Sequence, residues 1–268
     1  MTLATGLRND NIASLGYELE TVADVERVRP LLVVCGLQVF EGEFEDADEA
    51  AYLVATTPAG GVAASVGWAI YGGEVAVIHS LAVAPSSRGG GLGASLLATT
   101  MLHLREDRAM ESVYVGIHRR LKGYFSRLGY LSAEQAPEGM EEHPIFEGDS
   151  VIAMVRRYGE QRHGLDKSAF CLIHNTTKGA TLPTGSVFWF RQSSVVLEAH
   201  YRGGSVARGH LLGAMEGGEL RFVWQACTND GELMRGEGEI MLKPLPDGRR
   251  EMREQLGEDP GELLLREF

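Results

Sequence analysis

The feature that most constrains the fold of this 268-residue sequence is a change of hydrophobic periodicity near residue 158. Before that point, runs with helical spacing alternate with β-like runs, whereas after it only short β-like runs punctuated by glycine remain. Apolar residues recur every three or four positions in a helix and every second position in a half-buried strand. The change therefore predicts two domains with separate cores, a mixed domain over residues 1–160 and an antiparallel β domain over residues 168–268.

The first half is predicted to begin with a strand, Tyr17–Val22, and a helix whose apolar stripe extends from Val25 to Cys35. Pro30 lies inside that stripe and should kink or restart the helix. Three runs separated by glycine turns then predict an antiparallel meander. The meander strands and the later elements are strands Ala51–Pro58, Val62–Tyr71 and Glu74–Val83, helix Gly91–Arg105, strand Ser112–Ile117, helix Arg119–Leu128 and strand Val151–Tyr158.

The second half predicts an antiparallel barrel or sandwich, because short β-like runs recur at near-regular spacing with glycine turns between them. No regular element is predicted between residues 159 and 185, and helical spacing returns only in the last residues. The predicted strands are Val187–Arg191, Val195–Tyr201, Gly209–Met215, Glu219–Ala226 and Gly236–Leu242. The fold class is thus α+β, with an all-β barrel-like domain at the carboxyl end.

Composition excludes several classes of function. The formal net charge of -12 repels phosphate backbones, so we expect no nucleic-acid partner. The sequence shows no signal peptide and no apolar run of membrane-spanning length, which predicts a cytoplasmic protein without a membrane partner. Neither the three separated cysteines nor the histidines His174, His200 and His210 have the spacing of metal ligands, so we expect no metal.

The most informative segment, Ile78–Ala94, leads from a strand through a glycine cluster directly into a helix. Glycines let backbone N–H groups approach a phosphate closely, and a helix N-terminus adds partial positive charge. Arg88 can contribute a full positive charge. The segment therefore suits a pyrophosphate.

Three interpretations of this segment compete. It could be a plain glycine turn in a protein with 34 glycines, or a dinucleotide-binding loop, because Gly89, Gly91 and Ala94 fit that spacing. A dinucleotide loop needs an acidic residue after the next strand, where this sequence has Ile117-His-Arg-Arg120. The third interpretation is a family motif, Arg-x-x-Gly-x-Gly, formed by Arg88, Gly91 and Gly93.

A second motif favours the third interpretation. Leu81-Ala-Val-Ala-Pro85 leads into the loop, and Tyr124-Phe-Ser-Arg-Leu-Gly-Tyr130 follows the next strand. With these motifs in this order, residues 17–158 resemble the GNAT family of N-acetyltransferases, most closely its short arsenic-resistance and N-acetylglutamate-synthase-like members. Such relatives often carry an arginine where this sequence has Ala133–Pro137, so a glutamate-like acceptor is not implied.

The resemblance implies a mixed, mostly antiparallel, splayed sheet that binds acetyl-CoA and transfers the acetyl group to the amine of a small molecule, with amino-acid-like compounds among the candidate acceptors. Acetyl and amine would meet between the strands Glu74–Val83 and Ser112–Ile117. Leu81, Ala82 and Val83 would lie along the pantetheine arm, to which Leu81 and Val83 would offer backbone groups. The pyrophosphate would be held by Arg88, Gly89, Gly90, Gly91, Leu92, Gly93 and Ala94.

The usual catalytic groups of the family are absent from their positions. Val77 stands where many relatives have a glutamate base, and His79 on the same strand face is the nearest titratable substitute. Phe125 stands where a tyrosine acid is usual, and Tyr124 is adjacent. His79 could equally be a strand histidine satisfied by its neighbours, and water could protonate the thiolate. A non-catalytic acyl-CoA sensor and a nucleotide-dependent oxidoreductase remain alternative functions.

The carboxyl-terminal half resembles a family of small bacterial β proteins, through Tyr201-Arg-Gly-Gly204, Arg208–Gly213 and Asn229–Met234. We expect a small lipocalin-like barrel with inward aromatic residues. It would serve as a dimerisation or stabilising module, giving a homodimer, or as a pocket for a small ligand.

Overall fold

The computed structural model describes residues 9–42, 44–159, 164–176, 181–256 and 261–268. The chain forms two compact units. Unit 1 comprises residues 16–158 of the described chain, and unit 2 comprises residues 9–15 together with those from 159 onward. Within the described residues, no helix combines the length and apolar character that crossing a bilayer requires.

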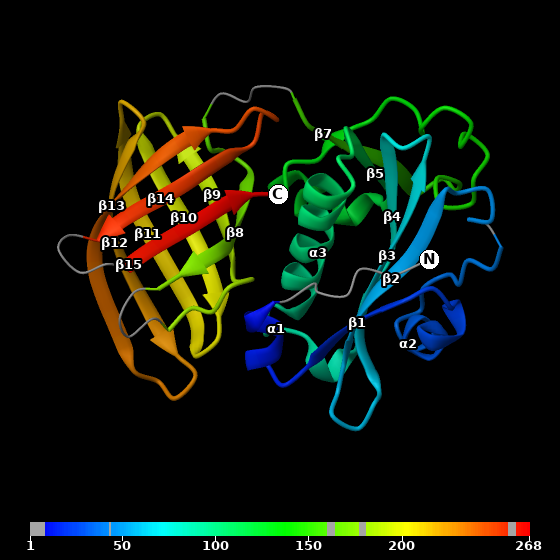
Figure 1. The fold of residues 1–268 in the computed structure, drawn as a ribbon, viewed down its shortest axis with the longest axis horizontal. Coiled ribbons are helices and arrows are strands. Elements are labelled where there is room, and N and C mark those ends of the chain that lie inside the picture. The colour runs from blue at the N-terminus through cyan, green and yellow to red at the C-terminus, as the bar shows by residue number, and fades with distance from the viewer. Residues whose placement is uncertain (1–8, 43, 160–163, 177–180, 257–260) are drawn as a thin grey trace. The chain divides into compact units, whose positions relative to one another are not determined.

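Unit 1 is built on a seven-stranded sheet of order β1-β2-β3-β4-β5-β7-β6 (Figure 1). Its strands are β1 (Glu18–Val22), β2 (Glu49–Thr56), β3 (Val62–Tyr71), β4 (Val75–Val83), β5 (Ser112–His118), β6 (Leu131–Ser132) and β7 (Val151–Arg157). Its helical segments are η1 (Val25–Arg27), α2 (Arg29–Val34), η2 (Pro85–Ser87), α3 (Leu92–Leu102), η3 (His103–Asp107), η4 (Arg119–Leu121) and α4 (Lys122–Arg127). The antiparallel registers of β2 with β3 and of β3 with β4 confirm the predicted meander.

Local chemistry explains the helix boundaries. Pro30 sits in the first turn of α2, where its missing N–H costs no hydrogen bond, so the predicted helix restarts there after η1. The helix expected to reach Arg105 ends its α-helical part at Leu102 and continues as a π-helical segment, η3. Strand β6 was not predicted, because its two residues are too few to show periodicity.

Strands β4 and β5 are the only parallel neighbours in the described sheet, and they pair over only part of their length. Their register extends from Val75 opposite Ser112 to Ile78 opposite Val115 and then stops. Beyond that point β4 stays on β3 while β5 stays on β7. The predicted splay is therefore present at the end of β4 that leads into the glycine loop.

Unit 2 is a closed barrel in which every strand is antiparallel to its neighbours, which confirms the predicted barrel. The strands follow chain order, and β15 closes the barrel by pairing with β8. They are β8 (Ser168–Asn175), β9 (Val187–Ser193), β10 (Val196–Gly203), β11 (Val206–Glu216), β12 (Glu219–Thr228), β13 (Leu233–Pro244), β14 (Arg250–Leu256) and β15 (Gly261–Glu267). Alternate side chains point inward and form one apolar core.

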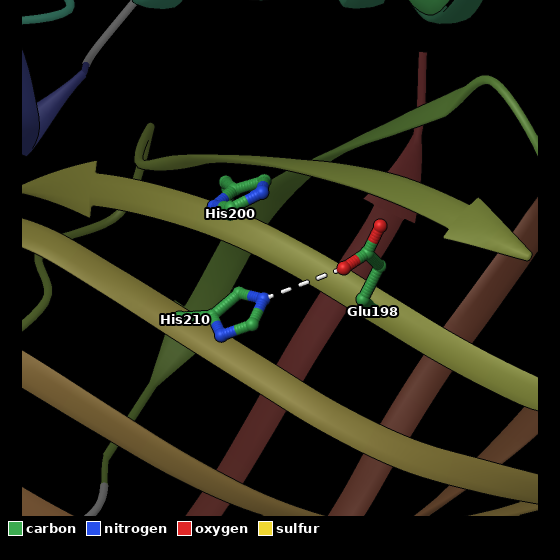
Figure 2. A group of neighbouring side chains, drawn as sticks. All are labelled: Glu198, His200 and His210. Carbon is green, nitrogen blue, oxygen red and sulfur yellow. Dashed lines mark ion pairs between the residues drawn. The ribbon is translucent and has the colours of Figure 1, made fainter.

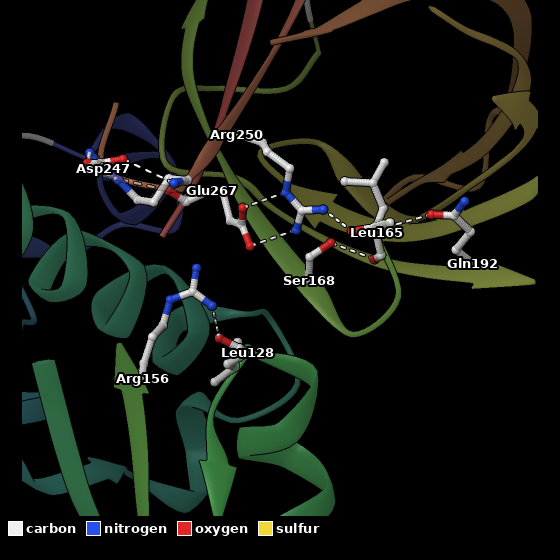
Figure 3. A network of polar contacts seen from close by, with 10 residues as sticks. Leu128, Arg156, Leu165, Ser168, Gln192, Asp247, Arg250 and Glu267 are labelled. Carbon is white, nitrogen blue, oxygen red and sulfur yellow. Dashed lines mark hydrogen bonds and ion pairs between the residues drawn. The ribbon is translucent and has the colours of Figure 1, made fainter. Parts of the chain in front are cut away.

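A buried ion pair ties two neighbouring segments of the barrel together (Figure 3). The Arg250 guanidinium on β14 binds both carboxylate oxygens of Glu267 on β15, at 2.8 and 2.9 Å. A further guanidinium nitrogen of Arg250 donates to the carbonyl oxygen of Gly164. This bidentate geometry satisfies charges that would otherwise be costly to bury.

Strands β8, β14 and β15 correct the sequence-based prediction. The run Ala169–Leu172 is continuously buried, so β8 lacks the alternation that would reveal a strand. The end of the chain, predicted as helical, is β15, because consecutive leucines suit either structure. The short helix α1 (Asp10–Ser14), also unpredicted, belongs to unit 2, where the buried Asn11 side chain accepts a hydrogen bond from the Gly204 N–H at 2.9 Å.

Candidate functional site

The predicted cofactor loop joins the splayed end of β4 to α3. Gly89 and Gly91 have φ values of +93° and +88°, a left-handed conformation that favours glycine. Gly91 is the N-cap of α3, and no side chain of the described residues caps this helix. The first intrahelical bond joins the Ser95 N–H to the Gly91 carbonyl oxygen, so the preceding amides at the helix start are available to an anion.

Arg88 is exposed and folds back onto β4. Its Nε donates to the Val83 carbonyl oxygen at 3.0 Å, and that oxygen also accepts from the Cys35 thiol at 3.4 Å. Exposed arginines exchange partners at low cost, because water replaces the lost hydrogen bond. The guanidinium can therefore turn from the carbonyl oxygen toward a bound phosphate.

Two irregularities shape the edge of β4 beside the splay. Ser80 has a φ of +52°, and the register with β3 shifts there, so that Ser80 and Leu81 together oppose one residue of β3. Such a bulge bends the strand and interrupts its pairing. A Cβ at Gly93 would lie 2.8 Å from a methyl carbon of Val83, so glycine lets α3 begin directly against β4.

His79 lies in an aromatic cluster rather than in water, with only 4% of its surface exposed. The Phe44 ring stacks on its imidazole at 4.1 Å between centroids, and the Tyr52 ring meets it edge-on at 5.2 Å. The Phe44 ring also stacks with the imidazole of His143, at 5.0 Å between centroids. The Nδ1 atom lies 3.1 Å from the Ser80 hydroxyl, whereas Nε2 has no hydrogen-bond partner within the described chain.

Burial lowers the pKa of His79 from 6.5 to about 3, and the carbonyl group of Trp68 opposes this shift only partly. The pKa of the buried side chain thus differs from the near-neutral value that the sequence suggested. The imidazole is neutral at pH 7, where one ring nitrogen can accept a proton or a hydrogen bond. A Cβ at Gly67 on β3 would overlap the His79 ring, so this glycine makes room for the imidazole.

The second motif, Tyr124–Tyr130, lies in a different environment from His79. Phe125, at the usual position of the acid, is buried against the Tyr130 ring, and the Tyr130 hydroxyl lies 3.1 Å from the Met101 sulfur. Tyr124 is half-buried and meets the Phe125 ring edge-on at 5.3 Å. Burial raises the pKa of Tyr124 to about 12, so its phenol keeps its proton at neutral pH.

The structure thus brings Leu81–Val83 and Arg88–Ala94 together around the end of β4. His79 and Tyr124, in contrast, lie in separate ring clusters, because no aromatic residue of the described chain contacts both of them. Sequence reasoning did not identify Phe44 and His143 as site residues. Phe44 lies in the acidic segment 41–49, which composition alone presents as solvated, and His143 follows a glutamate pair in a loop. Neither position carries a periodic signal that would place it beside β4.

The fold and loop define an acyltransferase-type domain followed by a closed antiparallel barrel. Residues 21–130 match the family model described as the acetyltransferase (GNAT) family, and residues 163–265 match the model described as avidin-like protein. Each match covers less than half of the chain, but the first covers most of unit 1, which has the GNAT fold, and the second covers most of the barrel, which is avidin-like in fold. The sequence predicts a lipocalin-like barrel. Lipocalins and avidin-like barrels share the up-and-down strand order seen here.

Solved structures similar to this chain include an acetyltransferase from Streptococcus agalactiae, with 13% identity and a TM-score of 0.42, which covers 53% of this chain and 98% of that chain. An acyl-CoA N-acyltransferase from Pseudomonas aeruginosa has 18% identity and a TM-score of 0.39 and covers 52% of this chain and 99% of that chain. A Mycobacterium tuberculosis protein in complex with CoA and NLQ has 15% identity and a TM-score of 0.39, covering 52% and 98%. None of the curated proteins matches this sequence.

We predict that Gly93→Asp abolishes acetyl-CoA binding, because it places a carboxylate at the helix start and crowds Val83. Gly123→Asp is the matched control, since Gly123 is exposed on α4 and a Cβ there meets only the end of Arg127. Titration calorimetry measures both affinities, and circular dichroism confirms folding. Unchanged affinity in a folded Gly93→Asp protein would defeat the loop assignment.

We also predict that His79 makes unit 1 sensitive to acid. Its folded pKa is about 3 and its unfolded value 6.5, so its contribution to stability is complete above pH 6.5 and is lost as the pH falls toward 3. The loss should approach about 1.4 kcal/mol per pH unit, and His79→Leu should remove it. Urea unfolding at several pH values measures this, with the exposed His118→Leu as control. Parallel pH profiles of wild type and His79→Leu would contradict the burial of this imidazole.

Proposed function

We propose that unit 1 is an N-acyltransferase that binds acetyl-CoA and acetylates the amine of a small molecule. The observation that carries this proposal is the interrupted pairing of β4 with β5 directly beside a glycine loop and an uncapped helix start. The match of residues 21–130 to the GNAT family supports the same reaction class. Together they offer a slot for an extended arm and an anion site at its end.

In this proposal the pyrophosphate is held by Arg88, Gly89, Gly90, Gly91, Leu92, Gly93 and Ala94. The pantetheine arm lies along Leu81, Ala82 and Val83, on the side of β4 that has no partner from β5. When Arg88 turns to the phosphates it releases the Val83 carbonyl oxygen, which can then accept from a pantetheine amide. One movement of one side chain thus prepares both contacts.

The chemistry then needs one proton acceptor and one proton donor. The amine nitrogen attacks the acetyl carbonyl carbon, the carbon–sulfur bond breaks, and the nitrogen loses one proton while the CoA sulfur gains one. We assign the acceptor role to His79, which is neutral at pH 7 and whose Nε2 has no hydrogen-bond partner within the described chain. Because its pKa is about 3 in the free protein, this role requires that the bound acyl-CoA and amine change its surroundings and raise the pKa. The donor role falls to Tyr124, the protonated phenol nearest the usual acid position.

The surroundings of His79 indicate the class of acceptor. Phe40, Phe44 and Tyr52 place ring faces and edges against the imidazole, and His143 stacks on Phe44. The segment 41–49, which supplies Phe44, is rich in acidic residues, and negative charge attracts ammonium groups. An amine with an apolar or aromatic body fits this environment better than a free amino acid does.

The test is thiol release from acetyl-CoA over a panel of aryl-alkyl amines, polyamines and amino acids. We predict that aryl-alkyl amines exceed amino acids about tenfold or more in kcat/KM, a difference of about 1.4 kcal/mol. His79→Ala should lower kcat while acetyl-CoA affinity stays the same. Binding of acetyl-CoA without transfer to any amine would instead favour the non-catalytic sensor, and stabilisation by NADPH alone would favour an oxidoreductase.

A cavity in the barrel supports a second function, binding of a small ligand by unit 2. The cavity has a volume of about 400 Å³, and aromatic residues on its wall include Phe188, Phe190, Phe222 and Trp224. Glu254 also lines it, with 8% of its surface exposed, and has no hydrogen bond or ion pair with any described residue. A buried carboxyl without a partner is costly, so we infer a ligand with an apolar body and a donor group that faces Glu254.

Burial raises the pKa of Glu254 above 4.5, so its contribution to stability is complete below pH 4.5 and is lost as the pH rises through the folded value. We predict that Glu254→Gln raises the melting temperature at pH 8 but not at pH 4. The same variant should weaken binding of 2-phenylethylamine, the probe amine. Glu251→Gln is the control and should be destabilising, because Glu251 pairs with Arg253 and Arg266. A lower melting temperature at pH 8 for Glu254→Gln would mean that the carboxylate has a stabilising partner.

A further inference from the structure

Two histidines and a glutamate meet on the outer surface of the barrel (Figure 2). His200 on β10 pairs directly with His210 on β11, and Glu198 lies two residues before His200 on the same strand. Their neighbours Leu197, Ala199 and Leu211 are buried in the core. Strand alternation therefore directs all three side chains outward, to one face.

The three side chains already approach the spacing of metal ligands. The imidazoles stack with centroids 4.7 Å apart and an angle of 22° between their planes. The His210 Nε2 atom lies 3.6 Å from a carboxylate oxygen of Glu198. One nitrogen or oxygen from each of the three residues lies within 4.8 Å of the others.

Hydrogen bonding does not explain this arrangement. The separation of 3.6 Å is too long for a hydrogen bond, and the buried His210 Nε2 has no hydrogen-bond partner among the described residues. The three donor atoms thus face one another without a hydrogen bond between them among the described residues.

We propose that Glu198, His200 and His210 bind a divalent transition-metal ion of the Zn²⁺ type. Imidazole nitrogens and one carboxylate oxygen are ligands that such ions accept, at about 2.0–2.2 Å. Donor atoms on one tetrahedral ion lie about 3.3 Å apart, so the side chains must close only modestly. They can do so by rotation, since the side chains of His210 and Glu198 are 33% and 38% exposed. Three protein ligands leave one position open to water.

The site is independent of the acetyl-transfer proposal and has its own test. The full chain, without an affinity tag and after treatment with a chelator, is titrated with Zn²⁺ by calorimetry and with Co²⁺ by visible absorption. We expect one ion per chain and d–d bands of a low-coordinate Co²⁺ site. His200→Ala and His210→Ala should each weaken binding about tenfold or more, and Glu198→Gln should weaken it measurably.

His174→Ala is the matched control, because His174 is an exposed histidine on β8 of the same barrel. It should bind Zn²⁺ as the wild type does, and all variants should melt at the wild-type temperature without metal. The proposal is overturned if the wild type binds no ion at micromolar concentration. Wild-type affinity in His210→Ala, or equal loss in His174→Ala, overturns it as well.

Discussion

The early end of pairing between β4 and β5 is the constraint on which the rest of unit 1 depends. Past Ile78 and Val115, each strand keeps one partner, β3 for β4 and β7 for β5. A buried backbone group without a partner costs about 1–3 kcal/mol, so such an opening needs water or a ligand to fill it. The bulge at Ser80 and Leu81 bends β4 away, and Gly116 admits the Ile145 backbone against β5. These features hold the strands apart without a ligand, which is what a preformed cofactor slot requires.

Unit 2 differs from unit 1 because its sheet closes on itself and has no free edge among the described strands. Its strands pair all round the barrel, so the backbone of its described residues offers no comparable opening. The unpartnered polar group is instead a side chain, Glu254, held inside an apolar wall where Gly238 leaves room for it. The open strand edges of unit 1 and the buried Glu254 of unit 2 are both polar groups that a ligand could satisfy, and this makes both places candidate binding sites.

Local patterns made much of the fold predictable. Strand β3 has the predicted bounds, and Pro30 and the glycine loop act as their residue types dictate. The rings around His79 were not predictable, because Phe44 and His143 come from distant loops whose path depends on tertiary packing. The pairing of His200 with His210 also has a tertiary cause. A bulge between Tyr201 and Gly203 shifts the hairpin register by one residue, and only then do the two histidines stand opposite each other.

The most direct test of the account is a crystal structure of the chain with acetyl-CoA. The account predicts pyrophosphate oxygens at hydrogen-bond distance from the amides of Leu92, Gly93 and Ala94, with Arg88 turned away from the Val83 carbonyl oxygen. It also predicts the pantetheine arm along Leu81–Val83, in the gap beyond Ile78 and Val115. A complex in which β4 and β5 pair along their whole length, with CoA bound elsewhere or not at all, would contradict it.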